Sequence, residues 1–145
     1  MISVLAAAGE VASRLAVETL YRHYYDEDDV PLPPAIRLER AVTEANLSVY
    51  EQAVTVDAQS GMGTTLVLAL FYSDKVVVAH VGDSRVYRLR GRSLEPVTAD
   101  HSLVRELLEK GVISPDEVKN NPYGHVITKA VGIREKVVPE VQEFE

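Results

Sequence analysis

The sequence predicts an α+β domain in which helices pack on an antiparallel β-sheet. Residues 64–72 and 75–81 are apolar runs rich in Val and Leu, and the turn-prone pair Ser73-Asp74 separates them. Runs of this length, bounded by Gly, Ser and Asp, are typical of strands buried on both faces. The segments before and after these runs carry apolar residues at helical spacing. We therefore expect helices on either side of a central sheet.

Two helices are predicted before the sheet. Residues 10–25 place Val11, Leu15 and Leu20 on one face. The acidic residues 26–29 and the prolines that follow form a loop that ends this helix. Residues 35–53 predict the second helix, with Pro34 in its first turn, where a missing N–H is tolerated. Its apolar face consists of Leu38, Ala41, Val42, Ala45 and Val49.

The central strands are expected to form a meander. Residues 85–89 alternate, with Tyr87 and Leu89 on one face, which is typical of a half-buried strand. Gly91-Arg92 turns the chain into a last short strand over residues 93–97. Four consecutive antiparallel strands are the simplest arrangement of these segments.

The C-terminal third continues with short elements. Residues 102–110 predict a helix that Gly111 stops. Ser114-Pro115-Asp116-Glu117 begins another, because Ser can cap, Pro suits the first position and Glu can bond back to the cap. Residues 126–131 alternate as a strand, and residues 137–144 predict a further strand.

Length and composition exclude several classes of protein. A chain of 145 residues suits one domain. Its net charge of −7 argues against nucleic acid as a partner, because phosphate binding needs clustered Lys and Arg. Without cysteine there is no disulfide framework and no thiolate metal site. Residues 1–8 are apolar but too short to span a bilayer. We expect a soluble protein of the cytoplasm without a membrane partner.

The residues themselves leave the chemistry open. Gly61-Met62-Gly63-Thr64-Thr65 lacks the Lys of a nucleotide-binding loop and precedes a strand, so a glycine turn is the favoured interpretation. Asp83 could offer a carboxylate oxygen to Mg²⁺ or Mn²⁺, although a single carboxylate holds such a cation weakly. Asp100 and His101 could be acid–base or ligand residues, or an ordinary helix start. His80 and His125 are interpreted as structural.

Taken in order, four motifs resemble a known family. GMGTT, VGDSRVYRLR, the segment ending TADHS, and VITKAVG occur in the order and spacing of the bacterial type of the metal-dependent protein phosphatase 2C family. The resemblance implies a β-sandwich of two antiparallel sheets flanked by helices, a site for Mg²⁺ or Mn²⁺, and phosphoproteins carrying phosphoserine or phosphothreonine as substrates. The residues that match the family's motifs are Gly9, Glu10, Gly61, Gly63, Thr64, Thr65, Gly82, Asp83, Ser84, Arg85, Asp100, His101 and Gly132.

The chain also departs from the family. The segment that would align with the family's metal-binding DGMGGH motif is residues 1–6, MISVLA, which holds none of its ligands. Only Asp83 matches a metal ligand, in the accessory third-metal position, so we assign no catalytic residue. We expect residues 1–145 to form one incomplete domain that lacks the family's first and last strands, and that does not bind Mg²⁺ or Mn²⁺ stably.

Three functional interpretations follow from this departure. The chain is a truncated phosphatase, inactive in this form, or a non-catalytic pseudophosphatase that acts as a binding module. The third is a hydrolase that builds a site from Asp83, Asp100 and His101 across an oligomer. Uncovered sheet edges are expected to produce a homo-oligomer.

Overall fold

A computed structural model describes residues 8–25 and 31–145. The predicted acidic loop at residues 26–29 and the predicted ligand-free segment 1–6 lie outside the described residues. The described elements are, in chain order, α1 (Gly9–Tyr24), α2 (Pro34–Thr55), the short 3-10 helix η1 (Asp57–Gln59), β1 (Leu66–Tyr72), β2 (Lys75–Val81), β3 (Tyr87–Arg90), β4 (Ser93–Pro96), α3 (Leu103–Glu109), α4 (Pro115–Val118) and β5 (Glu140–Phe144).

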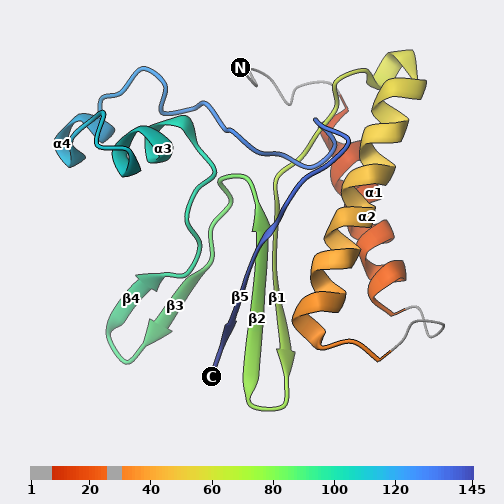
Figure 1. Ribbon diagram of the computed structural model, residues 1–145, viewed down its shortest axis with the longest axis horizontal. Coiled ribbons are helices and arrows are strands. Elements are labelled where there is room, and N and C mark those ends of the chain that lie inside the picture. Colours follow the sequence, from red (N-terminus) through yellow and green to blue (C-terminus); the bar gives the residue numbers. More distant parts are fainter. Residues whose placement is uncertain (1–7, 26–30) are drawn as a thin grey trace.

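Helices α1 and α2 form an antiparallel pair that lies against one side of the sheet (Figure 1). The predicted face of α2 is confirmed, because all five of its apolar residues are buried. In α1 the innermost residues are Ala12, Ala16 and Thr19, and the predicted Val11, Leu15 and Leu20 are partly buried beside the same core. The small side chains of Ala12 and Ala16 let α1 approach α2 closely. Each helix contributes one apolar stripe to the same core.

The main sheet has three antiparallel strands in the order β1-β2-β5. Strand β2 is central, and its Val77, Ala79 and Val81 face the helices with no exposed surface. The prediction that both apolar runs are buried on both faces holds for β2 and is wrong for β1. β1 is an edge strand, and the side chain of Phe71 on its far face is 77% exposed.

The predicted four-stranded meander is also wrong. β3 and β4 pair only with each other, as a separate hairpin whose Leu89 and Leu94 lie opposite one another and are exposed. The second neighbour of β2 is β5, more than 50 residues away in sequence, from His80↔Glu140 to Val76↔Phe144. A consecutive-strand argument cannot find this pairing, because the turn after β2 directs the chain away from the sheet.

The remaining elements follow the sequence more closely. The hydroxyl of Ser102 caps α3 by accepting the Arg105 N–H at 3.3 Å, and Glu117 bonds back to Ser114 at the start of α4. The strand predicted at residues 126–131 does not form, and this segment makes two isolated bridges, Thr64↔Val131 and Ser102↔Ile127. The last strand begins at Glu140, three residues later than predicted.

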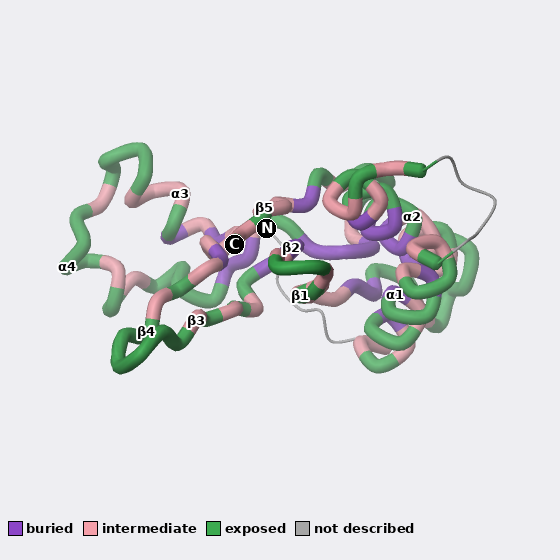
Figure 2. The backbone as a smooth tube through the Cα atoms, turned by 90° about the horizontal axis from the view of Figure 1, so that it is seen from below, coloured by how far each residue is buried: buried purple, intermediate pink, exposed green. Residues whose placement is uncertain are grey.

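Buried residues concentrate between the helix pair and β2, whereas the hairpin and the α3–α4 region are largely exposed or half-buried (Figure 2). Among the described helices, none combines the length and apolar character needed to cross a bilayer. The fold class predicted from the sequence, α+β with helices on an antiparallel sheet, is confirmed.

Candidate functional site

The motif segments, which are far apart in the sequence, meet at one end of the sheet, where β1 begins and β2 ends (Figure 1). Thr64 forms a bridge with Val131, with N···O distances of 3.0 and 2.8 Å in the two directions. The hydroxyls of Thr65 and Ser84 lie 2.8 Å apart. The Thr128 N–H donates to the His101 carbonyl at 2.8 Å. Hydrogen bonds therefore join all four motifs into one cluster.

The turn after β2 presents Asp83 to solvent. Gly82 has a φ of +107°, and a Cβ built there would lie 2.5 Å from Cγ2 of Thr65, so glycine is needed at this position. Asp83 follows directly and is exposed. The glycine therefore serves two purposes: it lets the GDSR and GMGTT segments pack together and it turns the next side chain outward.

Behind this turn lies a pair of buried imidazoles. The rings of His80 and His101 are stacked, with centroids 4.6 Å apart and planes inclined by 6°. His80 Nε2 lies 2.8 Å from the Ala99 carbonyl oxygen. His101 Nδ1 accepts the Gly82 N–H at 3.0 Å, and its Nε2 faces a carboxylate oxygen of Glu140 at 3.7 Å. Burial lowers the pKa of His101, and the nearby Lys129 and His80 lower it further.

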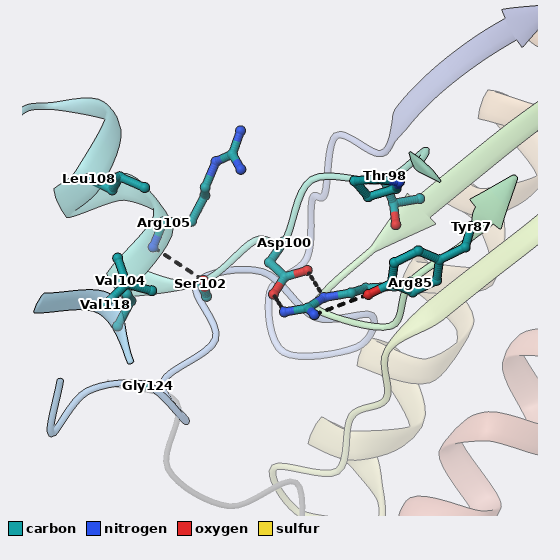
Figure 3. Close-up of a pocket in the computed structure, with 11 residues that line it drawn as sticks. Arg85, Tyr87, Thr98, Asp100, Ser102, Val104, Arg105, Leu108, Val118 and Gly124 are labelled. Atoms are coloured by element: carbon teal, nitrogen blue, oxygen red, sulfur yellow. Dashed lines mark hydrogen bonds and ion pairs between the residues drawn. The ribbon is translucent and has the colours of Figure 1, made fainter. Parts of the chain in front are cut away.

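Beside the turn, Arg85 and Asp100 close one side of a pocket of about 380 Å³ (Figure 3). The guanidinium donates to both carboxylate oxygens of Asp100, at 2.7 and 2.5 Å, and to the Tyr87 hydroxyl at 3.3 Å. This bidentate pairing with Asp100, together with the Tyr87 contact, raises the pKa of Arg85. The remaining wall comes from α3 and its flanks, including Thr98, Ser102 and Arg105.

Other predicted motif residues are structural or lie apart from this cluster. Gly132 has a φ of +87°, and its N–H donates at 2.8 Å to Oδ1 of the fully buried Asn46. Gly61 also has a positive φ, of 72°, and Gly63 lies two residues later beside the bridge at Thr64. At the other end of the motif set, Gly9 and Glu10 form the first turn of α1.

Sequence reasoning did not single out Asn46, Thr98 or Arg105, and it treated Tyr87 only as a strand residue. Asn46 carried a signal that could have been used, because it is a polar residue beside the apolar stripe of a helix. Such a residue, when buried, needs partners. No sequence pattern predicts the lining of the pocket beside Arg85 and Asp100. Its residues come from β3, α3 and their flanks, which are brought together only by folding.

The described residues do not fit a two-cation centre. Among them, the one group of three or more His, Asp and Glu side chains close enough to share an ion is His80, His101 and Glu140, and Asp83 is not part of it. Imidazole lone pairs lie in the ring plane, so two parallel stacked rings cannot both direct a nitrogen at one ion. His101 Nδ1 is already occupied by Gly82. Asp100 is likewise held by Arg85.

Helices on one side of an antiparallel sheet, with glycine turns and an exposed aspartate at its end, agree with the protein phosphatase 2C scaffold that the motif order led us to expect. A sequence model described as protein phosphatase 2C matches residues 22–110. The chain belongs to the protein phosphatase 2C family.

Similar proteins and structures agree with this assignment. The chain is 38% identical over 139 residues to the serine/threonine phosphatase stp of Listeria welshimeri, covering 94% of this chain and 54% of the relative. It is 32% identical over 133 residues to the protein phosphatase PhpP of Streptococcus pneumoniae, covering 92% and 54%.

Among solved structures, serine/threonine phosphatase Stp1 of Staphylococcus aureus superposes with a TM-score of 0.84 at 36% identity, covering 94% of this chain and 54% of that one. The Mycobacterium tuberculosis phosphatase PstP/Ppp gives 0.82 at 34% identity, covering 96% and 58%. The chain thus spans about half the length of the relatives it matches.

Proposed function

We propose that this chain carries the scaffold of a metal-dependent protein serine/threonine phosphatase that acts on phosphoproteins in the cytoplasm. The meeting of the four motif segments at one end of the sheet, with Asp83 presented there, carries the proposal. Its relatives include named serine/threonine phosphatases. Mg²⁺ or Mn²⁺ as the cation is supported by the catalytic domain of PstP in complex with 2 manganese ions, 33% identical with a TM-score of 0.76.

We further propose that residues 1–145 form one partial domain that does not hydrolyse phosphoproteins by itself. Asp83 is exposed and belongs to no cluster of three ligands among the described residues. A lone carboxylate holds Mg²⁺ or Mn²⁺ weakly, because hard cations of this kind need several oxygen ligands. The alternative of a site built from Asp83, Asp100 and His101 across an oligomer has no support in the contacts, since Asp100 and His101 are already engaged.

A chimera tests the phosphatase scaffold against the binding-module alternative. Residues 9–145 would replace the matching part of Listeria welshimeri stp, whose remaining sequence would supply what this chain lacks. We expect Mn²⁺-dependent hydrolysis of a phosphoserine peptide, reduced by Asp83→Asn. The matched control is Asp74→Asn, the same change at an exposed position in the β1–β2 turn at the opposite end of the sheet. A folded chimera without hydrolysis would favour the non-catalytic module.

We also propose that the isolated chain forms a homo-oligomer. Within the described residues, β1 and β5 are both edge strands of the main sheet, and Phe71 is exposed on the face turned away from the helices. Open edges and apolar surface favour association. Size-exclusion chromatography with light scattering should therefore give a mass at or above twice 16.0 kDa. A well-folded monomer would contradict this part of the proposal.

A further inference from the structure

His101 holds both polar groups of the Gly82 backbone. Its own N–H donates to the Gly82 carbonyl at 3.0 Å, and its Nδ1 accepts the Gly82 N–H at 3.0 Å. One residue therefore fixes the peptide groups on both sides of Gly82, directly before Asp83. An amide N–H can only donate, so Nδ1 is the unprotonated nitrogen and the neutral ring carries its proton on Nε2.

The His101 ring is itself held in place. It stacks on His80, which is 1% exposed and lies near the end of the central strand β2. Nε2 of His80 lies 2.8 Å from the Ala99 carbonyl, and because a carbonyl oxygen can only accept, this ring nitrogen is the donor. Ala99 precedes His101 by two residues, and this contact anchors the same segment that carries His101. The backbone and the ring of His101 are thus both fixed against the sheet.

From these contacts we propose that His101 is a positioning residue for the Gly82–Asp83 turn, and that it sets the direction in which the Asp83 carboxylate is presented. The inference rests on the proposed function, because it gives Asp83 the role of the cation-binding side chain. Gly82 alone does not fix the turn, since glycine is the residue with the widest choice of backbone conformation. The two hydrogen bonds from His101 supply the missing restraint.

Neither of the two more familiar roles of histidine fits this site. The parallel stacking of the rings keeps His101 and His80 from sharing a cation. As a general base His101 would need a free ring nitrogen that a substrate can reach, but Nδ1 is bonded to Gly82 and the side chain is 10% exposed. A positioning role, in contrast, requires only the two hydrogen bonds between His101 and Gly82 that the structure shows.

Two substitutions of His101 separate the hydrogen bond from the ring stack. His101→Asn keeps an acceptor near the Nδ1 position but removes the ring, and His101→Phe keeps a ring on His80 but removes the acceptor. The backbone bond from residue 101 to Gly82 is available in both variants. The measurement is amide hydrogen exchange of Gly82 in the full 145-residue chain, with the ¹⁵N order parameter of Asp83 as a second readout. The amide of Val131, which bonds to Thr64, reports whether the variant is folded.

We expect the Gly82 amide to be protected in the wild type and in His101→Asn. In His101→Phe it should exchange about threefold to tenfold faster, the change expected from losing one hydrogen bond. The order parameter of Asp83 should fall in the same variant, while the amide of Val131 stays protected. A rapidly exchanging Gly82 amide in the wild type would overturn the proposal. So would equal protection in His101→Phe, or loss of protection at Gly82 alone in His101→Asn.

These readouts do not depend on catalysis. A chimera that fails to hydrolyse phosphopeptide leaves the exchange result intact, and an unprotected Gly82 leaves the phosphatase scaffold intact. The ring ¹⁵N shifts of His101 give an independent signature, because the positioning role requires the Nε2–H tautomer. The opposite tautomer would remove the acceptor from the Gly82 N–H and contradict the proposal.

Discussion

At the scale of the residue, the backbone at Gly132 lies directly against α2, in contact with Val49 and Asn46. A Cβ built at Gly132 would be 2.2 Å from Cγ1 of Val49, which is fully buried. The glycine of the VITKAVG motif is therefore required by packing as well as by its positive φ.

Gly132→Ala should lower the free energy of unfolding by about 1–3 kcal/mol more than Gly111→Ala, the range expected for overpacking. Gly111 is the matched control, because it also has a positive φ, of +67°, but no atom lies within 4 Å of its Cβ position. Urea unfolding of the two variants measures the difference. Equal losses would mean that backbone strain, rather than contact with Val49, decides the effect.

His101 also makes stability depend on pH. In the folded chain its pKa lies below the ordinary value of 6.5, because burial disfavours the charged ring, and Lys129 and His80 also face it. Glu140 and Asp100 oppose the shift without reversing it. Between the folded pKa and 6.5 the unfolded chain binds more protons. The free energy of unfolding contributed by this ring is therefore complete above pH 6.5 and falls as the pH decreases below it.

Urea unfolding at about pH 7.5 and pH 5.5 tests this dependence. The wild type should lose stability at the lower pH, and His101→Asn should lose less, with the exposed His125→Asn as the control. The pKa values of Glu95, Glu117 and Glu143 lie below 4.5, so these carboxylates affect stability only at lower pH. Equal pH dependence in wild type and His101→Asn would exclude this contribution from His101.

At the scale of the element, the side chain of Asn46 on α2 forms three hydrogen bonds with the C-terminal segment. The amide nitrogen of Asn46 donates to the carbonyls of Arg134 and Glu135, each at 3.0 Å, and its oxygen accepts the Gly132 N–H at 2.8 Å. Asn46 is fully buried. Its contacts hold the loop before β5 against the middle of the helix.

Asn46→Ala should lower the free energy of unfolding by about 2–4 kcal/mol, because it leaves the buried Gly132 N–H and two partly buried carbonyls without their side-chain partner. Thr43→Ala is the control on the same helix, since the Thr43 hydroxyl is exposed and bonds only to Glu39 one turn away. Thermal unfolding monitored by circular dichroism distinguishes the two. A loss no larger than that of Thr43→Ala would show that Asn46 does not anchor the segment.

The sequence correctly predicted the features that depend on neighbouring residues in the chain. The helix faces follow from spacing, and the start of α4 follows from Ser114, Pro115 and Glu117. The β2–β5 pairing and the failure of residues 126–131 to form a strand depend on long-range contacts. In the site, the motif order identified Gly82, Asp83 and His101, but stacking of His101 on His80 depends on how two distant segments fold together.

At the scale of the whole molecule, two regions differ in how far they are buried. The helix pair and β2 form a closed core, whereas the hairpin β3–β4 and helices α3 and α4 extend to one side of the sheet (Figures 1 and 2). The motif cluster lies between these regions. Among the described residues, the scaffold therefore presents Asp83 outside any group of three side chains that could share an ion.

Titration of Mn²⁺ into the ¹⁵N-labelled chain tests this claim most directly, because the paramagnetic ion broadens the amide signals near wherever it binds. We predict weak broadening around Gly82, Asp83 and Ser84 that does not saturate with two ions per chain, and that Asp83→Asn removes. Saturable binding of two Mn²⁺ ions per chain, with hydrolysis of a phosphoserine peptide by the chain alone, would contradict it.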